Sequence, residues 1–127
     1  MKEKYDKNYN LIYYENSDKV KFWRKYNKNN RIIYEKDSDN NETLNKYDEN
    51  DNLIYSKYSP CHFEYWYKYD ENDNRIYYKD SHGREYWYKN DYWGKRTEIT
   101  KQEFKQIERT KLYLNIKRSN RFELMDI

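Results

Sequence analysis

The chain has 127 residues, of which 39% are charged, 35% hydrophobic and 20% aromatic, and its formal net charge is +3. So high a charged fraction is typical of disordered proteins, but regularly spaced aromatic residues supply a packing surface, and we expect a folded domain of modest core. Basic and acidic residues are interspersed without a run of one sign, which argues against a site for duplex nucleic acid.

The single cysteine, Cys61, excludes an internal disulfide. The chain shows neither a signal peptide nor an apolar stretch of the length that a membrane span needs. We therefore expect a cytoplasmic protein that does not enter a membrane.

After a charged lead-in of four residues, the chain repeats one unit about every 21–22 residues. The four copies begin at Tyr5, Tyr26, Tyr47 and Tyr69, and the clearest copy reads YDENDNRIYYKDSHGREYWYK from Tyr69. A fifth start at Asn90 loses the pattern. A period of this length is typical of repeat architectures.

Each copy contains two turns and two strands. In the clearest copy, residues 70–74 are only Asp, Glu and Asn, which form tight turns because Asn and Asp tolerate a positive φ. Residues 75–78 (RIYY) and 85–88 (EYWY) are β-branched and aromatic, as strands are, and 81–83 (SHG) is the second turn. Short strands joined by short turns pair antiparallel. The sequence therefore predicts a mainly β fold, an antiparallel β-hairpin repeat meander over residues 1–96.

The alternation along each strand separates two faces of the predicted sheet. One position of the first strand is always isoleucine and the next is always tyrosine. The second strand has Trp or Leu at one position, and Tyr or Phe stands beside each Trp. We predict a core face of Ile and Trp and a partly hydrated face of Tyr, whose hydroxyl reaches water. A lysine recurs before each junction, at Lys25, Lys46, Lys68 and Lys89, where its stem could cover ring edges.

Residues 97–127 differ from the repeats. Thr100 and Glu103 form a capping box, and Phe104 and Ile107 share one helical face, which predicts a helix from about Lys101 to Arg109. Residues 111–117 (KLYLNIK) alternate, which predicts a strand. We interpret this segment as a helix-plus-strand cap that protects the last repeat; the alternative is a helix that docks a partner.

The units YDENDNLIYSK and YDENDNRIYYKDS resemble the short tyrosine–aspartate repeats of RHS-type proteins, and in length and hairpin form they are similar to MORN repeats. They also resemble small tyrosine-rich arrays in phage and prophage reading frames of AT-rich bacteria, in which Gly stands where this chain has Asp51 and Asp73. This likeness covers Tyr5 to Lys89. It implies a small accessory protein without catalytic residues, of the kind that inhibits a host defence protein (anti-CRISPR-like).

Three patterns that could carry chemistry are better explained as structure. Asp48-Asn50-Asn52 begins like a calcium loop, but Leu53 stands where such a loop needs Gly. Cys61, His62 and His82 are too few ligands for a zinc site. A catalytic dyad of Cys61 and His62 is disfavoured because neighbours on a strand point to opposite faces. We therefore expect no metal, no cofactor and no enzymatic activity.

Aromatic rings interleaved with cations are the strongest binding signal, because such rings stack bases of single-stranded nucleic acid and dominate protein hot spots. The bland alternative is that the rings only pack along a single-layer sheet. We expect a protein that binds a host defence or nucleic-acid-handling protein by steric occlusion; the alternatives are a single-stranded RNA or DNA binding module and a structural or assembly protein that self-associates through its sheet edges. The candidate partner-binding residues are Tyr65, Tyr67, Lys68, Arg84, Tyr86, Tyr88, Lys89, Trp93 and Arg96.

Overall fold

The computed structural model describes residues 1–125, with side chains through Asn120. The chain divides into two units, residues 1–85 and 86–127. The elements are β1 (Lys2–Tyr5), β2 (Leu11–Glu15), β3 (Lys21–Tyr26), β4 (Ile32–Asp37), β5 (Glu42–Tyr47), β6 (Leu53–Ser59), β7 (Phe63–Tyr69), β8 (Arg75–Asp80), β9 (Glu85–Asn90), β10 (Arg96–Ile99) and α1 (Lys101–Met125).

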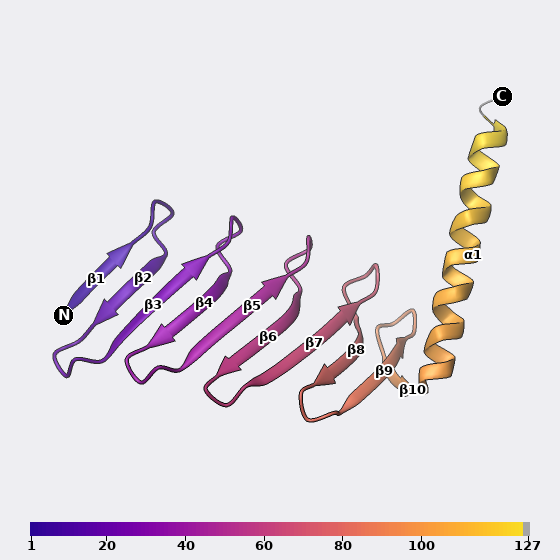
Figure 1. Ribbon diagram of the computed structural model, residues 1–127. Helices are drawn as coiled ribbons and strands as arrows, with labels where there is room; N and C mark the ends of the chain where they lie inside the picture. Colours follow the sequence, from indigo (N-terminus) through magenta and orange to yellow (C-terminus); the bar gives the residue numbers. More distant parts are fainter. Residues whose placement is uncertain (126–127) are drawn as a thin grey trace. The chain divides into compact units, whose positions relative to one another are not determined.

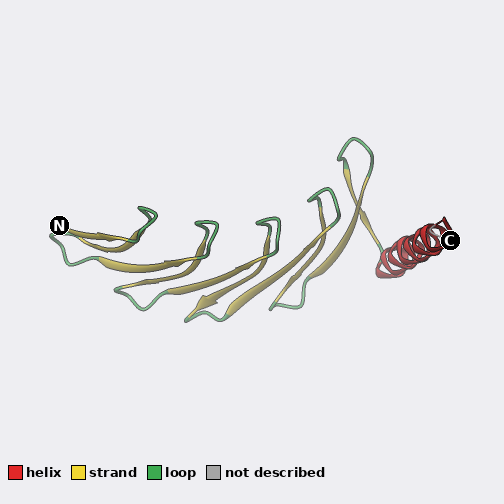
Figure 2. Ribbon diagram, turned by 90° about the horizontal axis from the view of Figure 1, so that it is seen from above, coloured by secondary structure: helices red, strands yellow, loops and turns green. Residues whose placement is uncertain are grey.

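The first unit is an antiparallel meander in which each strand pairs with the next strand in the sequence. Figure 1 shows β1 to β8 side by side in chain order, and Figure 2 shows these strands as one curved layer. In the second unit β9 pairs antiparallel with β10, and α1 follows. The predicted mainly β fold, an antiparallel hairpin repeat meander with a helix in its C-terminal segment, is therefore confirmed, whereas the strand predicted in that segment is not present.

Side chains at the first position of each turn hold the turn together. In the fourth repeat Asp70 Oδ1 accepts the backbone amides of Asn72 and Asn74, both at 2.9 Å, and Asp73 takes a φ of +63°. Asp6, Asn27 and Asp48 do the same in the earlier repeats. Asn and Asp thus replace Gly in the second to fourth repeats, as predicted, whereas Tyr9 takes the positive φ in the first. The oxygen spacing of the calcium-like segment is accounted for by this turn.

The turns on this edge of the sheet are also bonded to one another. The Asn10 side-chain amide donates to Asn30 Oδ1 at 2.8 Å, that of Asn29 to Asp51 Oδ1 at 2.9 Å, and that of Asn52 to Asp73 Oδ1 at 2.8 Å. In each case the acceptor is the residue with a positive φ. Each repeat is therefore joined to the next outside the backbone ladder.

A bulge interrupts the register once in each repeat, at the junction that follows Lys4, Lys25, Lys46 and Lys68. A tyrosine after three of these lysines donates its hydroxyl hydrogen to the carbonyl at the start of the preceding strand: Tyr26 to Leu11 at 2.8 Å, Tyr47 to Ile32 at 3.1 Å, and Tyr69 to Leu53 at 2.8 Å. The third repeat has its distorted turn, as predicted, with a cis Ser59–Pro60 bond and a φ of +59° at His62.

The register corrects the predicted faces. Tyr13 lies opposite Trp23 and Tyr55 opposite Trp66, and residues directly opposite share a face. Each Ile next to these tyrosines must therefore lie on the side away from the Trp residues, and the prediction of a joint Ile and Trp face is wrong. That prediction assumed how neighbouring strands pair, and the alternation within a single strand carries no information about this pairing. We call the two sides of β1–β8 the Trp face and the Ile face.

Neither face is covered by a thick core. Among the described residues, Ile76 and Ile99 are the only buried hydrophobic side chains, each 9% exposed. Ser56 and Asp80 are buried as well, and both belong to the Ile face. The Ser56 hydroxyl donates to Asn45 Oδ1 at 2.8 Å on the neighbouring strand. The sheet is thus a single layer in which most rings keep one side accessible to solvent.

Residues 111–117, predicted to be a strand, lie inside the continuous helix α1, and that prediction is wrong. The capping box is confirmed: Thr100 Oγ1 accepts the Glu103 amide at 3.1 Å and its hydroxyl donates to Glu103 Oε1 at 3.2 Å. Leu, Lys and Asn in this segment carry no helix breaker, so a helix that begins at a strong cap continues. Phe104 and Ile107 are half-buried, whereas Leu112, Tyr113, Leu114 and Ile116 are exposed.

Candidate functional site

The Trp face carries rows of lysine and aromatic side chains that run across neighbouring strands. One row joins Lys46 on β5, Tyr55 on β6, Trp66 on β7 and Lys79 on β8. Two equivalent rows are Lys4, Tyr13, Trp23 and Lys36, and Lys25, Tyr34, Leu44 and Lys57. A cation thus stands at both ends of each pair of packed side chains.

The contacts within these rows repeat with little variation. Lys46 Nζ lies 5.2 Å from the centre of the Tyr55 ring, the Tyr55 and Trp66 ring centres are 5.7 Å apart, and Lys79 Nζ lies 5.6 Å from the Trp66 ring. The lysines Lys4, Lys25 and Lys68 stand over Tyr13, Tyr34 and Tyr77 at 5.0–5.7 Å. These are the distances of cation–π contacts, which hold the ammonium groups beside the rings rather than neutralising them.

Alternation along the strands also sorts the charges. The lysines of the Trp face are Lys2, Lys4, Lys21, Lys25, Lys36, Lys46, Lys57, Lys68 and Lys79, and its acids are Glu15, Glu42 and Glu64. The formal charge of this face is therefore +6, twice that of the whole chain. The Ile face has Glu3, Glu35, Asp37 and Asp80 against Arg24 and Arg75, a formal charge of −2.

The acids of the Trp face are engaged with neighbouring side chains. Glu64 accepts the Tyr55 hydroxyl at 2.6 Å, and this hydrogen bond, with burial, raises the pKa of Tyr55 to about 12. Glu15 accepts the Tyr13 hydroxyl at 2.8 Å, which lowers the pKa of Glu15. Glu42 lies 3.7 Å from Lys36. At neutral pH these tyrosines stay protonated and serve as packing groups.

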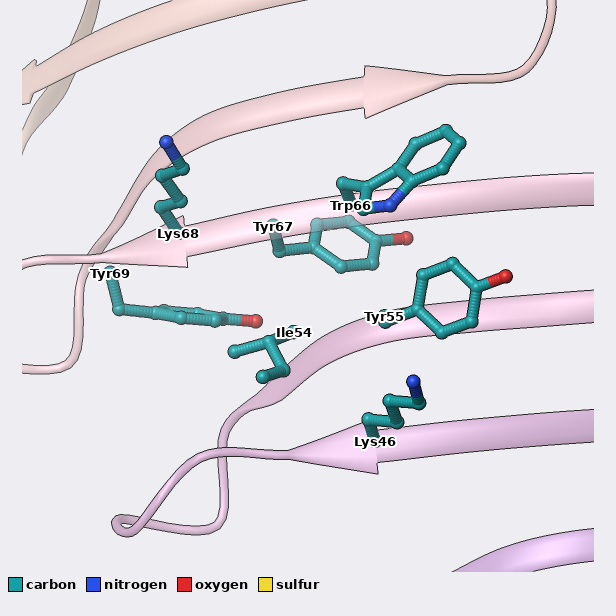
Figure 3. Close-up of a pocket in the computed structure, with 7 residues that line it drawn as sticks. All are labelled: Lys46, Ile54, Tyr55, Trp66, Tyr67, Lys68 and Tyr69. Carbon is teal, nitrogen blue, oxygen red and sulfur yellow. The ribbon is translucent and has the colours of Figure 1, made fainter.

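Two open hollows each have a tryptophan of this face among their lining residues. A hollow of about 670 Å³ is lined by Lys46, Ile54, Tyr55, Trp66, Tyr67, Lys68 and Tyr69, of which Lys46, Tyr55, Trp66 and Lys68 belong to the Trp face. Figure 3 shows the Tyr55 and Trp66 rings side by side on neighbouring strands. A second hollow of about 340 Å³ adjoins Trp23, which is 40% exposed. Its other lining residues are Lys19, Lys21, Lys36, Asp37, Ser38 and Asn40.

The Ile face holds a different aromatic group. Tyr65 and Tyr67 on β7 lie 6.3 and 5.7 Å from the Tyr78 ring, and the Arg75 guanidinium lies 5.4 Å from Tyr67. Burial and a hydrogen bond to Asp80 raise the pKa of Tyr78 to about 12. Burial works to raise the pKa of Asp80, but bonds from the Tyr78 hydroxyl and from the Arg84 and His82 amides outweigh it and lower that pKa.

The structure does not gather the nine candidate residues on one surface. Tyr65 and Tyr67 lie on the Ile face and Lys68 on the Trp face. Arg84 sits in a turn, 3.2 Å from Asp80.

The other five candidates belong to the second unit. Tyr86 and Tyr88 are neighbours there, with Arg96 4.8 Å from Tyr88. Lys89 lies opposite Thr97, and Trp93 is 86% exposed in the turn after β9. Their role in binding remains a prediction.

The residues of the Trp face that sequence reasoning missed are Trp23, Lys36, Tyr55, Trp66 and Lys79. The signal was present, because the single lysine of each of β4, β6 and β8 follows a tyrosine by two positions and so shares its face: Tyr34 and Lys36, Tyr55 and Lys57, Tyr77 and Lys79. A net charge counted along the chain hides such sorting, whereas a count by alternate positions reveals it.

No protein-family model matches this chain, and the comparison with curated proteins finds no relative. In the described part of the chain, no helix has the length and apolarity to cross a membrane, and no cluster of His, Cys, Asp and Glu is arranged to hold a metal ion.

Proposed function

We propose that this protein is a binding protein rather than an enzyme, and that it docks onto an anionic macromolecule through its Trp face. The observation that carries the proposal is the formal charge of +6 on a face whose lysines flank half-exposed rings. Charge of one sign on one surface attracts an oppositely charged partner, and aromatic rings supply the contact area once it is bound.

The shifted pKa values argue against proton transfer by these tyrosines at neutral pH. Burial and hydrogen bonds to Glu64, Glu85 and Asp80 raise the pKa of Tyr55, Tyr77 and Tyr78 to about 12. A catalytic acid or base works best with a pKa near the operating pH, and these hydroxyls are shifted away from it.

The biological role that we propose from the resemblance is an accessory protein that blocks a host defence system by steric occlusion. The charge of the Trp face narrows that role. The occluded partner would present either acidic side chains or the nucleic acid that a nucleic-acid-handling protein carries. The charge of the Trp face does not support the alternative of an assembly protein that self-associates through its sheet edges.

The proposal can be tested by salt elution from a heparin matrix, which serves as a general polyanion. Replacing Lys46 and Lys68 with Glu removes positive charge from the Trp face, and we expect elution at a clearly lower salt concentration than for the unaltered protein. The matched control replaces Lys7 and Lys28, exposed in turns, with Glu, which changes the net charge equally. Equal elution of the two variants would show that only net charge matters and would overturn the proposal.

A further inference from the structure

The chemistry of the Trp face identifies its partner more closely. We propose that the anionic partner is single-stranded nucleic acid, whose bases stack at Trp66 and Trp23 while its phosphates contact the flanking lysines. This inference rests on the proposed function, because it names the occupant of the same face.

Charge alone would suit any polyanion, but the positions of the rings are more selective. Trp23 is 40% exposed beside a hollow lined by Lys19, Lys21 and Lys36. Trp66 adjoins the larger hollow with Lys46 and Lys68, and Lys79 Nζ lies 5.6 Å from its ring. An open ring surface bordered by several ammonium groups offers a place for a planar base and for the phosphates on either side of it.

Single strands, duplexes and acidic proteins differ in what they can offer such a surface. A single strand exposes both the π-face of each base and a charged backbone. A duplex keeps its bases stacked inside and would use only the lysines, and an acidic polypeptide has the charge without an aromatic surface of matching regularity. Only the single strand uses both features of the rows.

The repeat also suits a linear polymer. Equivalent rows begin on β1, β3 and β5, two strands apart, which is about 10 Å for neighbouring strands about 4.8 Å apart. Trp23 and Trp66 occupy the first and third rows, and Leu44 stands between them. A strand that crosses the β-strands would meet a stacking site, an apolar side chain and a second stacking site.

The test measures binding of the full chain to fluorescein-labelled oligo(dT) and oligo(U) of about 15 nucleotides, within the range of known site sizes. Fluorescence anisotropy is recorded at two salt concentrations, with a duplex of equal length and poly-L-glutamate as competitors. We expect the single strands to bind more tightly than the duplex, to resist poly-L-glutamate, and to bind more weakly at higher salt.

Variants test the stacking. Trp66→Ala should weaken binding about tenfold, because one base–aromatic stack has about this effect, and Trp66→Phe should restore most of it. Tyr92→Ala is the control, since Tyr92 is 92% exposed, lies in the turn after β9 outside the Trp face, and is not one of the candidate binding residues. Circular dichroism confirms that each variant is folded.

The outcomes separate the two proposals. Retention on heparin with no binding of either oligonucleotide, or tighter binding of poly-L-glutamate, would overturn the nucleic-acid inference and leave an acidic protein as the partner. Equal affinity for duplex and single strand, or no effect of Trp66→Ala, would overturn the stacking role. Failure of the unaltered protein to be retained on heparin would overturn the proposed function itself.

Discussion

The Tyr69 hydroxyl donates a 2.8 Å hydrogen bond to the backbone carbonyl of Leu53, at the bulge that begins β6. Tyr47 and Tyr26 make the same bond to Ile32 and Leu11. A bulge leaves a backbone group outside the regular ladder, and a tyrosine from the next strand satisfies it in each of these repeats.

Tyr69→Phe should therefore destabilise the protein by about 1 kcal/mol, because the Leu53 carbonyl loses its partner. The measurement is urea denaturation followed by circular dichroism. Tyr9→Phe is the matched control, since Tyr9 is 88% exposed and its hydroxyl is hydrated in either state. Equal unfolding midpoints for the two variants would show that the bond adds nothing.

Lys19→Gly should stabilise the protein by about 0.5–1 kcal/mol. Lys19 has a φ of +62°, a conformation in which any residue with a Cβ is strained and Gly is not. Asp18→Gly in the same turn, where φ is not positive, should destabilise the fold through the flexibility of Gly in the unfolded chain. The prediction is wrong if Lys19→Gly unfolds at a lower urea concentration than the parent.

Thr100→Ala should cost about 1 kcal/mol of stability in α1, because the Glu103 amide at the helix start loses its acceptor. Helical circular dichroism during thermal melting reports the loss. Thr110→Ala serves for comparison: its hydroxyl bonds the Gln106 carbonyl inside the helix, where Ala is the better helix former. A greater loss of helix from the second variant would contradict the capping role.

Alkaline pH should weaken the fold over a defined range. Hydrogen bonding to Glu64 raises the pKa of Tyr55 from 10.0 to about 12. Burial and a hydrogen bond to Glu85 raise the pKa of Tyr77 to about 12 as well. Folding favours the protonated hydroxyl. Its contribution to the free energy of unfolding is therefore complete below pH 10 and is lost as the pH rises to about 12. Spectrophotometric titration should show tyrosines that ionise late.

Tyr55→Phe should remove part of this late phase, whereas Tyr92→Phe, at a side chain that is 92% exposed, should leave it unchanged. A late phase of the same size in both variants would assign the shifted pKa to other groups.

Local chemistry made most of the fold predictable. The Asp and Asn turns, the paired strands and the Thr100 cap each depend on residues close in the chain, and all appear as expected. The faces were mistaken because Tyr55 and Trp66 meet only through the register between strands. Within residues 111–117 the alternation of Leu, Leu and Ile fits a strand, but the helix started at Thr100 continues through it.

The candidate site was less predictable for the same reason. Lys68 and Trp93 were recognised as exposed cations and rings, but which cations stand around which ring depends on pairing across three or four strands. Lys79 meets Trp66 from β8, a partner that neither residue's own sequence neighbourhood reveals.

The side-chain bonds from Asn8, Asn29 and Asn50 to the positive-φ residue of the following turn give each of the first three repeats the same joint with its successor. A gene encoding such a chain can gain or lose whole units by duplication or deletion, since the new junction reuses an existing one. The length of the lysine-lined surface is then free to evolve in steps of one hairpin.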